Sequence, residues 1–226
     1  MTDFHGRNIL VTGGSGGIGG TTVRHLVKAN ANVIAAGRSQ EALAAIARET
    51  GCRTVTFDLA SEEEIRDALE GLDLWGVVNC GGFGGEIATP MDTDIAIFDK
   101  VITVNARGVL LVTKYATRQM VAIGKGGAIV NVSSQAALEN ITRCSALELG
   151  KYNIRVNSVN PTVVMTPISS GHWSQPHVAE PFLKQMPLGR WATEDEVAGP
   201  IVFLLSDAAS MITGIHLPID GGYTCR

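Results

Sequence analysis

The chain has 226 residues, of which 45% are hydrophobic and 18% charged, and its formal net charge is −4. This composition predicts one soluble globular domain, residues 1–226, with little room for a second. The 18 basic residues are scattered among 22 acidic ones, whereas nucleic-acid binding needs clustered lysine and arginine, so no nucleic-acid partner is expected. No apolar run approaches the roughly 20 residues of a membrane helix, so no membrane contact is expected either.

The four cysteines, Cys52, Cys80, Cys144 and Cys225, stand far apart in the sequence. They form no Cys-x-x-Cys pair and no histidine cluster accompanies them, so neither a disulfide framework nor a metal site is predicted. The N-terminal residues are polar and lead directly into an apolar run, without the pattern of a signal peptide. These features favour a cytoplasmic protein with reduced thiols.

Short runs rich in valine and isoleucine alternate with longer segments of helical period along the chain. This alternation is typical of βαβ units, and it predicts an α/β fold with one doubly wound, Rossmann-type parallel sheet and helices on both faces. The seven predicted strands are Asn8 to Val11, Val33 to Ala36, Thr54 to Phe57, Gly76 to Val78, Ala128 to Val132, Arg155 to Val159 and His216 to Ile219.

Glycines are concentrated directly after the first predicted strand, in Thr12-Gly13-Gly14-Ser15-Gly16-Gly17-Ile18-Gly19. Glycines between a strand and a helix permit a tight turn and let backbone N–H groups approach a pyrophosphate at the helix N-terminus. A purely structural turn is the alternative, but the following βαβ unit favours a dinucleotide site. The candidate cofactor-binding residues here are Gly13, Ser15, Gly17, Ile18 and Gly19.

The second predicted strand is followed by Gly37, Arg38 and Ser39, where an NAD site would carry an acidic residue for the ribose hydroxyls. No acid stands there. Arg38 is able to pair with a 2′-phosphate and Ser39 to hydrogen-bond it, so the sequence favours NADP(H) over NAD. The alternative is a solvated arginine in a loop.

Two further strand ends carry candidate cofactor-binding residues, because the carboxyl ends of parallel strands meet at one edge of the sheet. Asp58 and Leu59 follow the third strand, and we expect Asp58 to accept a hydrogen bond from the adenine amino group. An N-terminal cap on the next helix is an equal alternative for Asp58, although Ser61 with Glu64 forms a better capping box. After the fourth strand, Asn79 and Gly81 suit a close backbone approach to the adenosine ribose.

The second half of the chain contains one long helical segment and one segment broken by prolines. The helix is predicted from about Thr93 to Ile123, before a run of glycines that begins at Gly124. Residues 160–192 contain five prolines and are predicted to form loop and short helix, an insertion over the edge of the sheet of the kind that covers substrates.

Taken together, several motifs resemble those of the short-chain dehydrogenases/reductases, and the resemblance covers nearly the whole chain. They are Thr12 to Gly19, Asn79 to Gly82, Asn105, Asn131-Val132-Ser133-Ser134 and Asn157-Ser158-Val159-Asn160-Pro161. Three other stretches are similar to the subgroup of dicarbonyl and L-xylulose reductases, which reduces α-dicarbonyls and ketoses with NADPH as tetramers. They are Asn160 to Thr166, His172 to His177 and Pro187 to Arg190.

The resemblance implies roles for four more residues. Ser134 would donate a hydrogen bond to the carbonyl of the substrate, and Asn105 would organise backbone and water for a proton relay. Val164 and Thr166 would hold the nicotinamide carboxamide. The structural alternatives are that Ser134 caps the next helix and that Asn105 satisfies a neighbouring carbonyl.

The sequence departs from the family in one respect that concerns the chemistry. The family's Tyr-x-x-x-Lys, which supplies the proton and holds the nicotinamide ribose, is absent, and the chain runs from Gln135 directly into Ala136. Either a segment present in the protein is missing from this sequence, or the deletion is genuine and the protein is a catalytically impaired NADP-binding relative. The subgroup also tends to carry a lysine at the position of Gly16, which predicts weaker NADP selectivity here.

The expected function is therefore NADPH-dependent reduction of a small carbonyl compound, such as a dicarbonyl, a ketose or another ketone. A homo-oligomer, dimer or tetramer, is expected from the resemblance. A truly shortened helix after Ser134 would weaken that expectation, because the family packs subunits through this helix.

Overall fold

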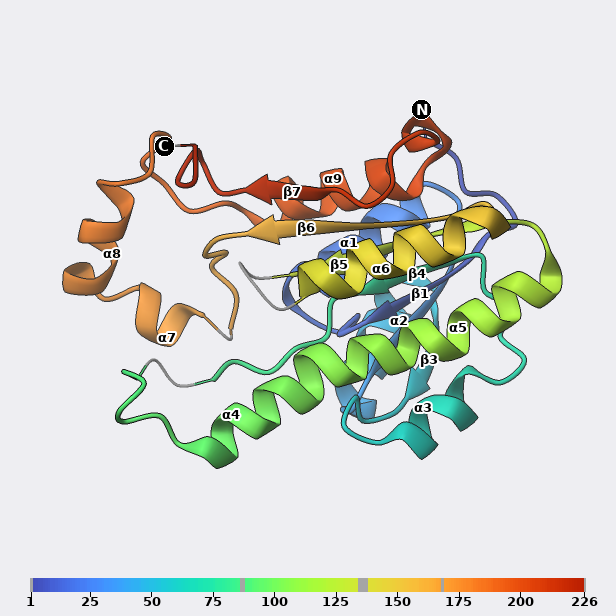
Figure 1. Cartoon of the computed structure of the whole chain (residues 1–226), viewed down its shortest axis with the longest axis horizontal. Helices are drawn as coiled ribbons and strands as arrows, with labels where there is room; N and C mark the ends of the chain where they lie inside the picture. Colours follow the sequence, from blue (N-terminus) through green and yellow to red (C-terminus); the bar gives the residue numbers. More distant parts are fainter. Residues whose placement is uncertain (1, 86–87, 134–137, 168, 226) are drawn as a thin grey trace.

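Seven parallel strands form one sheet in the order β3-β2-β1-β4-β5-β6-β7 (Figure 1). The computed structural model describes residues 2–85, 88–133, 138–167 and 169–225. Each predicted strand is present, with bounds that differ by at most two residues. The strands are β1 (Asn8–Thr12), β2 (Asn32–Gly37), β3 (Arg53–Thr56), β4 (Gly76–Asn79), β5 (Gly127–Val132), β6 (Ile154–Pro161) and β7 (His216–Ile219).

Helices cover both faces of the sheet (Figure 1). The helices in the described ranges are α1 (Gly17–Lys28), α2 (Gln40–Thr50), α3 (Glu62–Leu69), α4 (Ile95–Ile102), α5 (Val109–Ile123), α6 (Leu138–Leu149), α7 (Ser170–Trp173), α8 (Pro176–Leu183) and α9 (Glu194–Leu205). Side chains of α1, α2 and α9 join one hydrophobic core, and those of α3, α5 and α6 join the other. In β1, Ile9 faces the first core and Leu10 the second, so the strands need no polar alternation.

The order of the strands reverses at the centre of the sheet. From β1 the chain moves outward through β2 to β3, then returns to place β4 on the other side of β1. Thr12 at the end of β1 is in register with Asn79 at the end of β4. Open α/β sheets bind ligands at such a reversal, beyond the carboxyl ends of the strands.

The predicted long helix begins at Ile95, two residues later than expected, because Asp94 caps it by accepting a hydrogen bond from the Ala96 N–H. It ends at Ile123, where Gly124 adopts a left-handed conformation with φ of 70°. Between α4 and α5 lies a π-helical segment, Thr103–Gly108, that the hydrophobic pattern did not predict. Segments of this kind are frequent at functional sites, and this one carries Asn105.

The proline-rich segment forms α7 and α8 beyond the carboxyl end of β6 (Figure 1). Four aromatic residues hold the two helices together. Trp173 contacts Phe182 and Trp191 with ring centroids 5.2 and 5.7 Å apart, and Phe182 stacks on Tyr223 at 4.5 Å. This cluster lies apart from the two cores of the sheet and ties the segment to the C-terminal residues.

Within the described part of the chain, no helix is both long and apolar enough to cross a membrane.

Candidate functional site

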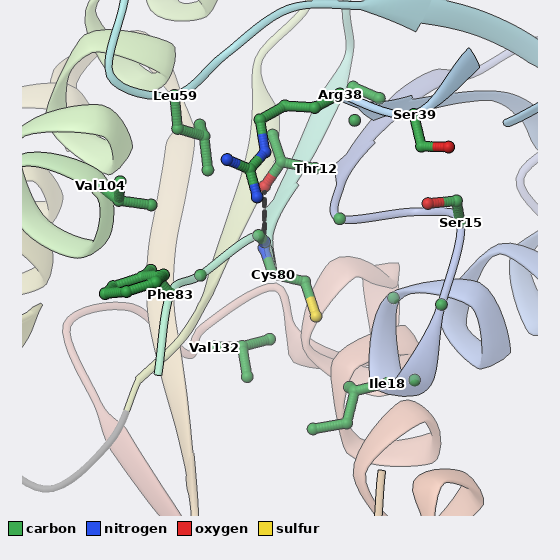
Figure 2. A pocket seen from close by; sticks show the side chains of 18 of the residues that line it. Thr12, Ser15, Ile18, Arg38, Ser39, Leu59, Cys80, Phe83, Val104 and Val132 are labelled. Atoms are coloured by element: carbon green, nitrogen blue, oxygen red, sulfur yellow. Dashed lines mark hydrogen bonds between the residues drawn. The ribbon is translucent and has the colours of Figure 1, made fainter. Parts of the chain in front are cut away.

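A cavity of about 410 Å³ opens at the carboxyl edge of the sheet, between the loops that follow β1, β2, β3 and β4 (Figure 2). Most of the residues predicted to bind a cofactor line it. They are Gly13, Ser15, Gly17, Ile18, Gly19, Arg38, Ser39, Asp58, Leu59, Gly81 and Thr166. The structure therefore gathers the four separate strand ends into one pocket.

The glycine loop requires its glycines for steric reasons at two positions. Gly13 has a φ of +65°, and a Cβ atom there would lie 2.8 Å from the Cα of Gly81. A Cβ on Gly19 would lie 2.2 Å from the carbonyl oxygen of Gly13, which no side chain tolerates. No described side chain caps the N-terminus of α1 and its first turn carries no acid. Its N–H groups are thus available to an anion in the pocket.

Arg38 and Ser39 lie at one end of the pocket (Figure 2). The Arg38 side chain is 68% exposed, and its nearest carboxylate is that of Asp58, with 4.0 Å between Nη1 and Oδ2. Ser39 caps α2 by accepting a hydrogen bond from the Ala42 N–H, while its side chain still borders the pocket. A cation and a hydroxyl therefore stand together beside the end of β2.

Asp58 is not the N-cap of α3, so the alternative interpretation of this residue is wrong. Ser61 caps the helix by accepting from the Glu64 N–H. The Glu64 carboxylate accepts from the Asp58 N–H instead of returning to Ser61, so the predicted capping box is only half formed. Asp58 accepts from the Ala60 N–H with Oδ1, and it borders the pocket.

Thr12 connects the loops after β1 and β4, a role that the sequence analysis missed. Its hydroxyl oxygen accepts hydrogen bonds from the N–H groups of Cys80 and Gly81, at 3.0 and 2.9 Å (Figure 2). The signal in the sequence is a hydroxyl residue at the last position of a strand, directly before the glycines. Thr12 sets how closely the two loops approach each other.

Cys80 borders the pocket, and Figure 2 draws its sulfur inside it. Burial, with a smaller contribution from the negative charge of Glu194, raises the pKa of the Cys80 thiol to about 12. The thiol therefore stays protonated at neutral pH and is not a nucleophile here.

The side-chain amide of Asn105 forms two hydrogen bonds with the backbone of Phe83. Its Oδ1 accepts from the Phe83 N–H at 2.8 Å and its Nδ2 donates to the Phe83 carbonyl at 2.9 Å. The π-helical segment thereby clamps the loop after β4, and Phe83 borders the pocket. Asn105 itself does not border it, so the structure gives Asn105 a positioning role on the backbone.

We expect Asn105→Ala to lower the free energy of unfolding by about 1–3 kcal/mol, because two backbone groups of Phe83 lose their partner. Urea denaturation followed by circular dichroism measures this change. Asn140→Ala, at an exposed position of α6, is the matched control and should change stability by less than about 0.5 kcal/mol. Equal stabilities of the two variants would contradict the clamp.

Asn79 and Val164 were predicted to bind the cofactor but do not border the pocket. The Asn79 side chain is buried and donates to Asn131 Oδ1 at 2.9 Å, and Asn131 in turn donates to Thr142 on α6. Val164 is also buried, and its carbonyl accepts from the Thr166 N–H. Asn79 therefore connects the strand ends to a helix. Of Val164 and Thr166, the two residues predicted to hold the nicotinamide carboxamide, only Thr166 borders the pocket.

Helix α6 is tied to the sheet by polar side chains at its first described turns. Arg143 Nε donates to His216 Nε2, so the other ring nitrogen carries the proton and donates to Ser158 Oγ at 2.7 Å. Ser158 donates to Asn160, which donates to Glu139 on the same helix. These hydrogen bonds tie α6 to β6 and β7.

Ser134 and the junction between Gln135 and Ala136 lie outside the described residues. The preceding residue, Ser133, is buried, and its N–H donates to the Val159 carbonyl at 2.9 Å. Val132, at the end of β5, borders the pocket. In the described ranges, no group of three or more histidine, cysteine or acidic side chains is arranged to hold a metal ion.

A family model described as enoyl-(acyl carrier protein) reductase, from the short-chain dehydrogenases/reductases, matches residues 13–224. The chain belongs to the short-chain dehydrogenase/reductase family. It is therefore an oxidoreductase. Similar relatives are an L-xylulose reductase from Caenorhabditis elegans, 40% identical over 98% of this chain and 97% of the relative, and a D-erythrulose reductase from Gallus gallus, 36% identical over 97% and 96%.

Solved structures of the same family share the fold. A short-chain dehydrogenase/reductase from Mycobacterium ulcerans has a TM-score of 0.94 and 31% identity, covering 99% of this chain and 92% of the other. A structure described as an NAD(P)-dependent gluconate 5-dehydrogenase from Beutenbergia cavernae, with NADP bound at low occupancy, has a TM-score of 0.92 and 28% identity, covering 99% of both chains.

The alignment with the Caenorhabditis elegans reductase extends over 245 residues, more than the 226 of this chain. Part of the relative therefore has no counterpart here.

Proposed function

We propose that this protein reduces a small carbonyl compound, a dicarbonyl, ketose or other ketone, with NADPH. The observation that carries the proposal is the pocket itself, in which the glycine loop and Arg38 stand beside one another at the reversal of strand order. The relatives named L-xylulose reductase and D-erythrulose reductase support a ketose or a similarly small carbonyl substrate.

The residues of the pocket fit a nucleotide that carries a 2′-phosphate. The uncapped N-terminus of α1 suits the pyrophosphate, and Arg38 with Ser39 suits the 2′-phosphate. Leu59 and Val104 supply apolar surface for the adenine ring. Asp58, with Oδ2 4.0 Å from Arg38, is available to the adenine amino group.

Bound NADPH would supply hydride to the carbonyl carbon of the substrate. Ser134 would donate its hydroxyl hydrogen to the carbonyl oxygen and stabilise the charge that develops there. Asn105 acts from outside the pocket by holding Phe83, and Thr166, which borders the pocket, would hold the nicotinamide carboxamide. The family's tyrosine is absent, so in the 226-residue chain the proton would come from solvent, which makes the reaction slow.

A second candidate is an NADP-binding relative without turnover. The missing Tyr-x-x-x-Lys is the observation in its favour. It is the weaker candidate, because relatives that align with nearly the whole chain are named reductases. Product formation from a carbonyl compound distinguishes the two, since both candidates bind NADPH.

Arg38→Ala tests the cofactor preference. We expect it to raise the Kd for NADPH about 10-fold, the lower end of the range for a charge-assisted hydrogen bond, because the side chain is 68% exposed. The Kd for NADH should change less than 2-fold, since NADH has no 2′-phosphate. Fluorescence titration of both cofactors measures this.

Arg48→Ala is the control for Arg38→Ala, because Arg48 is an exposed arginine of α2 that does not border the pocket. It should leave both affinities unchanged. Equal losses for NADPH and NADH in Arg38→Ala would contradict the assignment of Arg38 to the 2′-phosphate.

We also propose a homo-oligomer in the cytoplasm. Leu110 on α5 and Leu147 on α6 are 49% and 81% exposed, which supports contact between copies of the chain on these helices. All four cysteines are free, which agrees with a reducing compartment. Sedimentation velocity measures the oligomeric state.

A further inference from the structure

Lys100 borders the pocket but has no place in the proposed binding of the cofactor. It lies in the last turn of α4, and its Nζ stands 4.4 Å from the centre of the Phe83 ring. Lys100 forms no ion pair with any carboxylate among the described residues. A cation therefore stands at the pocket wall without an ion-pair partner among the described residues.

The position of Lys100 along the helix separates it from the adenine end of the pocket. Lys100 lies on α4, and Val104 and Gly108 follow it in the π-helical segment. Gly108 packs on Leu59, where a Cβ would meet the Leu59 carbonyl at 2.7 Å, and Val104 borders the pocket. Lys100 precedes Val104 by four residues and Gly108 by eight, so it lies farther along the helix from Leu59 than either of them.

Phe83 places this cation on the other side of the pocket from Ser15 and Ser39. Figure 2 shows Phe83 and Val132 across the pocket from Ser15 and Ile18, with the Arg38 guanidinium above them beside Leu59. Asn105 holds the backbone of Phe83 through two hydrogen bonds, and the Phe83 ring lies beneath the Lys100 ammonium group. Val132 is two residues from Ser134, so this side is where the substrate carbonyl is expected.

The phosphates of the cofactor are already matched by other groups of the pocket. The N-terminus of α1 lies across the pocket from Phe83, and Arg38 stands beside Leu59. We propose that Lys100, seated on Phe83, binds an anionic group of the substrate, a carboxylate or phosphate close to the reacting carbonyl. This rests on the proposed function and narrows its substrate class to anionic carbonyl compounds such as 2-oxo acids.

The test compares two probes of similar shape, pyruvate and the neutral diketone diacetyl, on protein saturated with NADP⁺. Isothermal titration gives the Kd of each probe without any turnover, so a protein that binds but does not react still tests the proposal. We expect Lys100→Ala to raise the Kd for pyruvate about 10-fold and that for diacetyl less than 2-fold. Lys100→Arg should retain most of the pyruvate affinity.

Lys114→Ala is the matched control, because Lys114 pairs with Glu62 on the outside of α5 and does not border the pocket. It should leave both probes unaffected. A rise in the Kd for NADP⁺ in Lys100→Ala, with unchanged pyruvate binding, would assign Lys100 to a cofactor phosphate and overturn the proposal. An equal rise in the Kd for pyruvate and for diacetyl would overturn the proposal as well, because it would mean that Lys100 only holds Phe83 in place.

Discussion

Insertion of a Tyr-x-x-x-Lys helix start between Gln135 and Ala136 is expected to raise kcat for carbonyl reduction on the order of 10²–10⁴-fold, the usual contribution of a positioned general acid. The family's tyrosine gives its proton to the developing alkoxide, and the lysine lowers the pKa of that tyrosine. The 226-residue chain carries neither in this pattern. The pocket that would receive the reactants is nevertheless assembled from the ends of β1 to β4.

The measurement is NADPH consumption with diacetyl, accompanied by detection of the hydroxyketone product. An insert of equal length with Phe-x-x-x-Met is the control, because it restores the helix without the acid and should not raise kcat. Intact mass must first give 23.8 kDa for the starting protein, since a mass greater by about one or two kDa would mean that the segment is already present. An inserted variant that folds and binds NADPH but remains inert would contradict the prediction.

Ser134→Ala is expected to lower kcat on the order of 10²-fold, comparable with the loss of one oxyanion donor. Strand β5 leads from Val132 at the pocket wall to the buried Ser133, and Ser134 is the next residue. The variant should keep its affinity for NADPH, because the residues assigned to the phosphates are on other strands. A merely structural serine would change stability without this selective loss of kcat.

Steady-state kinetics and fluorescence titration of the same preparation separate the two roles of Ser134. Ser210→Ala is the control, because Ser210 is an exposed serine that does not border the cavity. It should leave kcat within about 3-fold. An unchanged kcat in Ser134→Ala would remove the catalytic role of this hydroxyl.

The order of strands and helices was predictable because it depends on local signals. Strands buried on both faces appear as continuous apolar runs, and a glycine such as Gly124 marks the end of a helix wherever the fold places it. The π-helical segment was not predictable in this way. It differs from the surrounding helix in its backbone hydrogen bonds, which run from i to i+5 and which the pattern of side chains does not indicate.

The candidate site was predictable to the extent that it depends on strand ends. Gly13, Arg38, Asp58 and Gly81 reach one pocket because parallel strands end at one edge. Asn79 is also at a strand end, yet its side chain points into the helix layer and bonds Asn131. The face of the sheet toward which a side chain at a strand end points depends on the register of that strand. The spacing of the motifs in the sequence does not determine this register.

Lys100 and Phe83 were missed for a different reason. They are separated by 17 positions in the sequence and belong to no motif, and only the packing of α4 against the loop after β4 brings them together. A pair of this kind has no signature in a single sequence.

The most direct test of the proposed reduction uses [4,4-²H₂]NADPH and diacetyl with protein whose intact mass is 23.8 kDa. The account predicts that the hydroxyketone product carries deuterium on the new carbinol carbon, formed slowly in the 226-residue chain. The proposed reduction would be contradicted if the protein bound NADPH but gave no labelled product during an incubation long enough for even a slow enzyme to form product in excess of its own concentration.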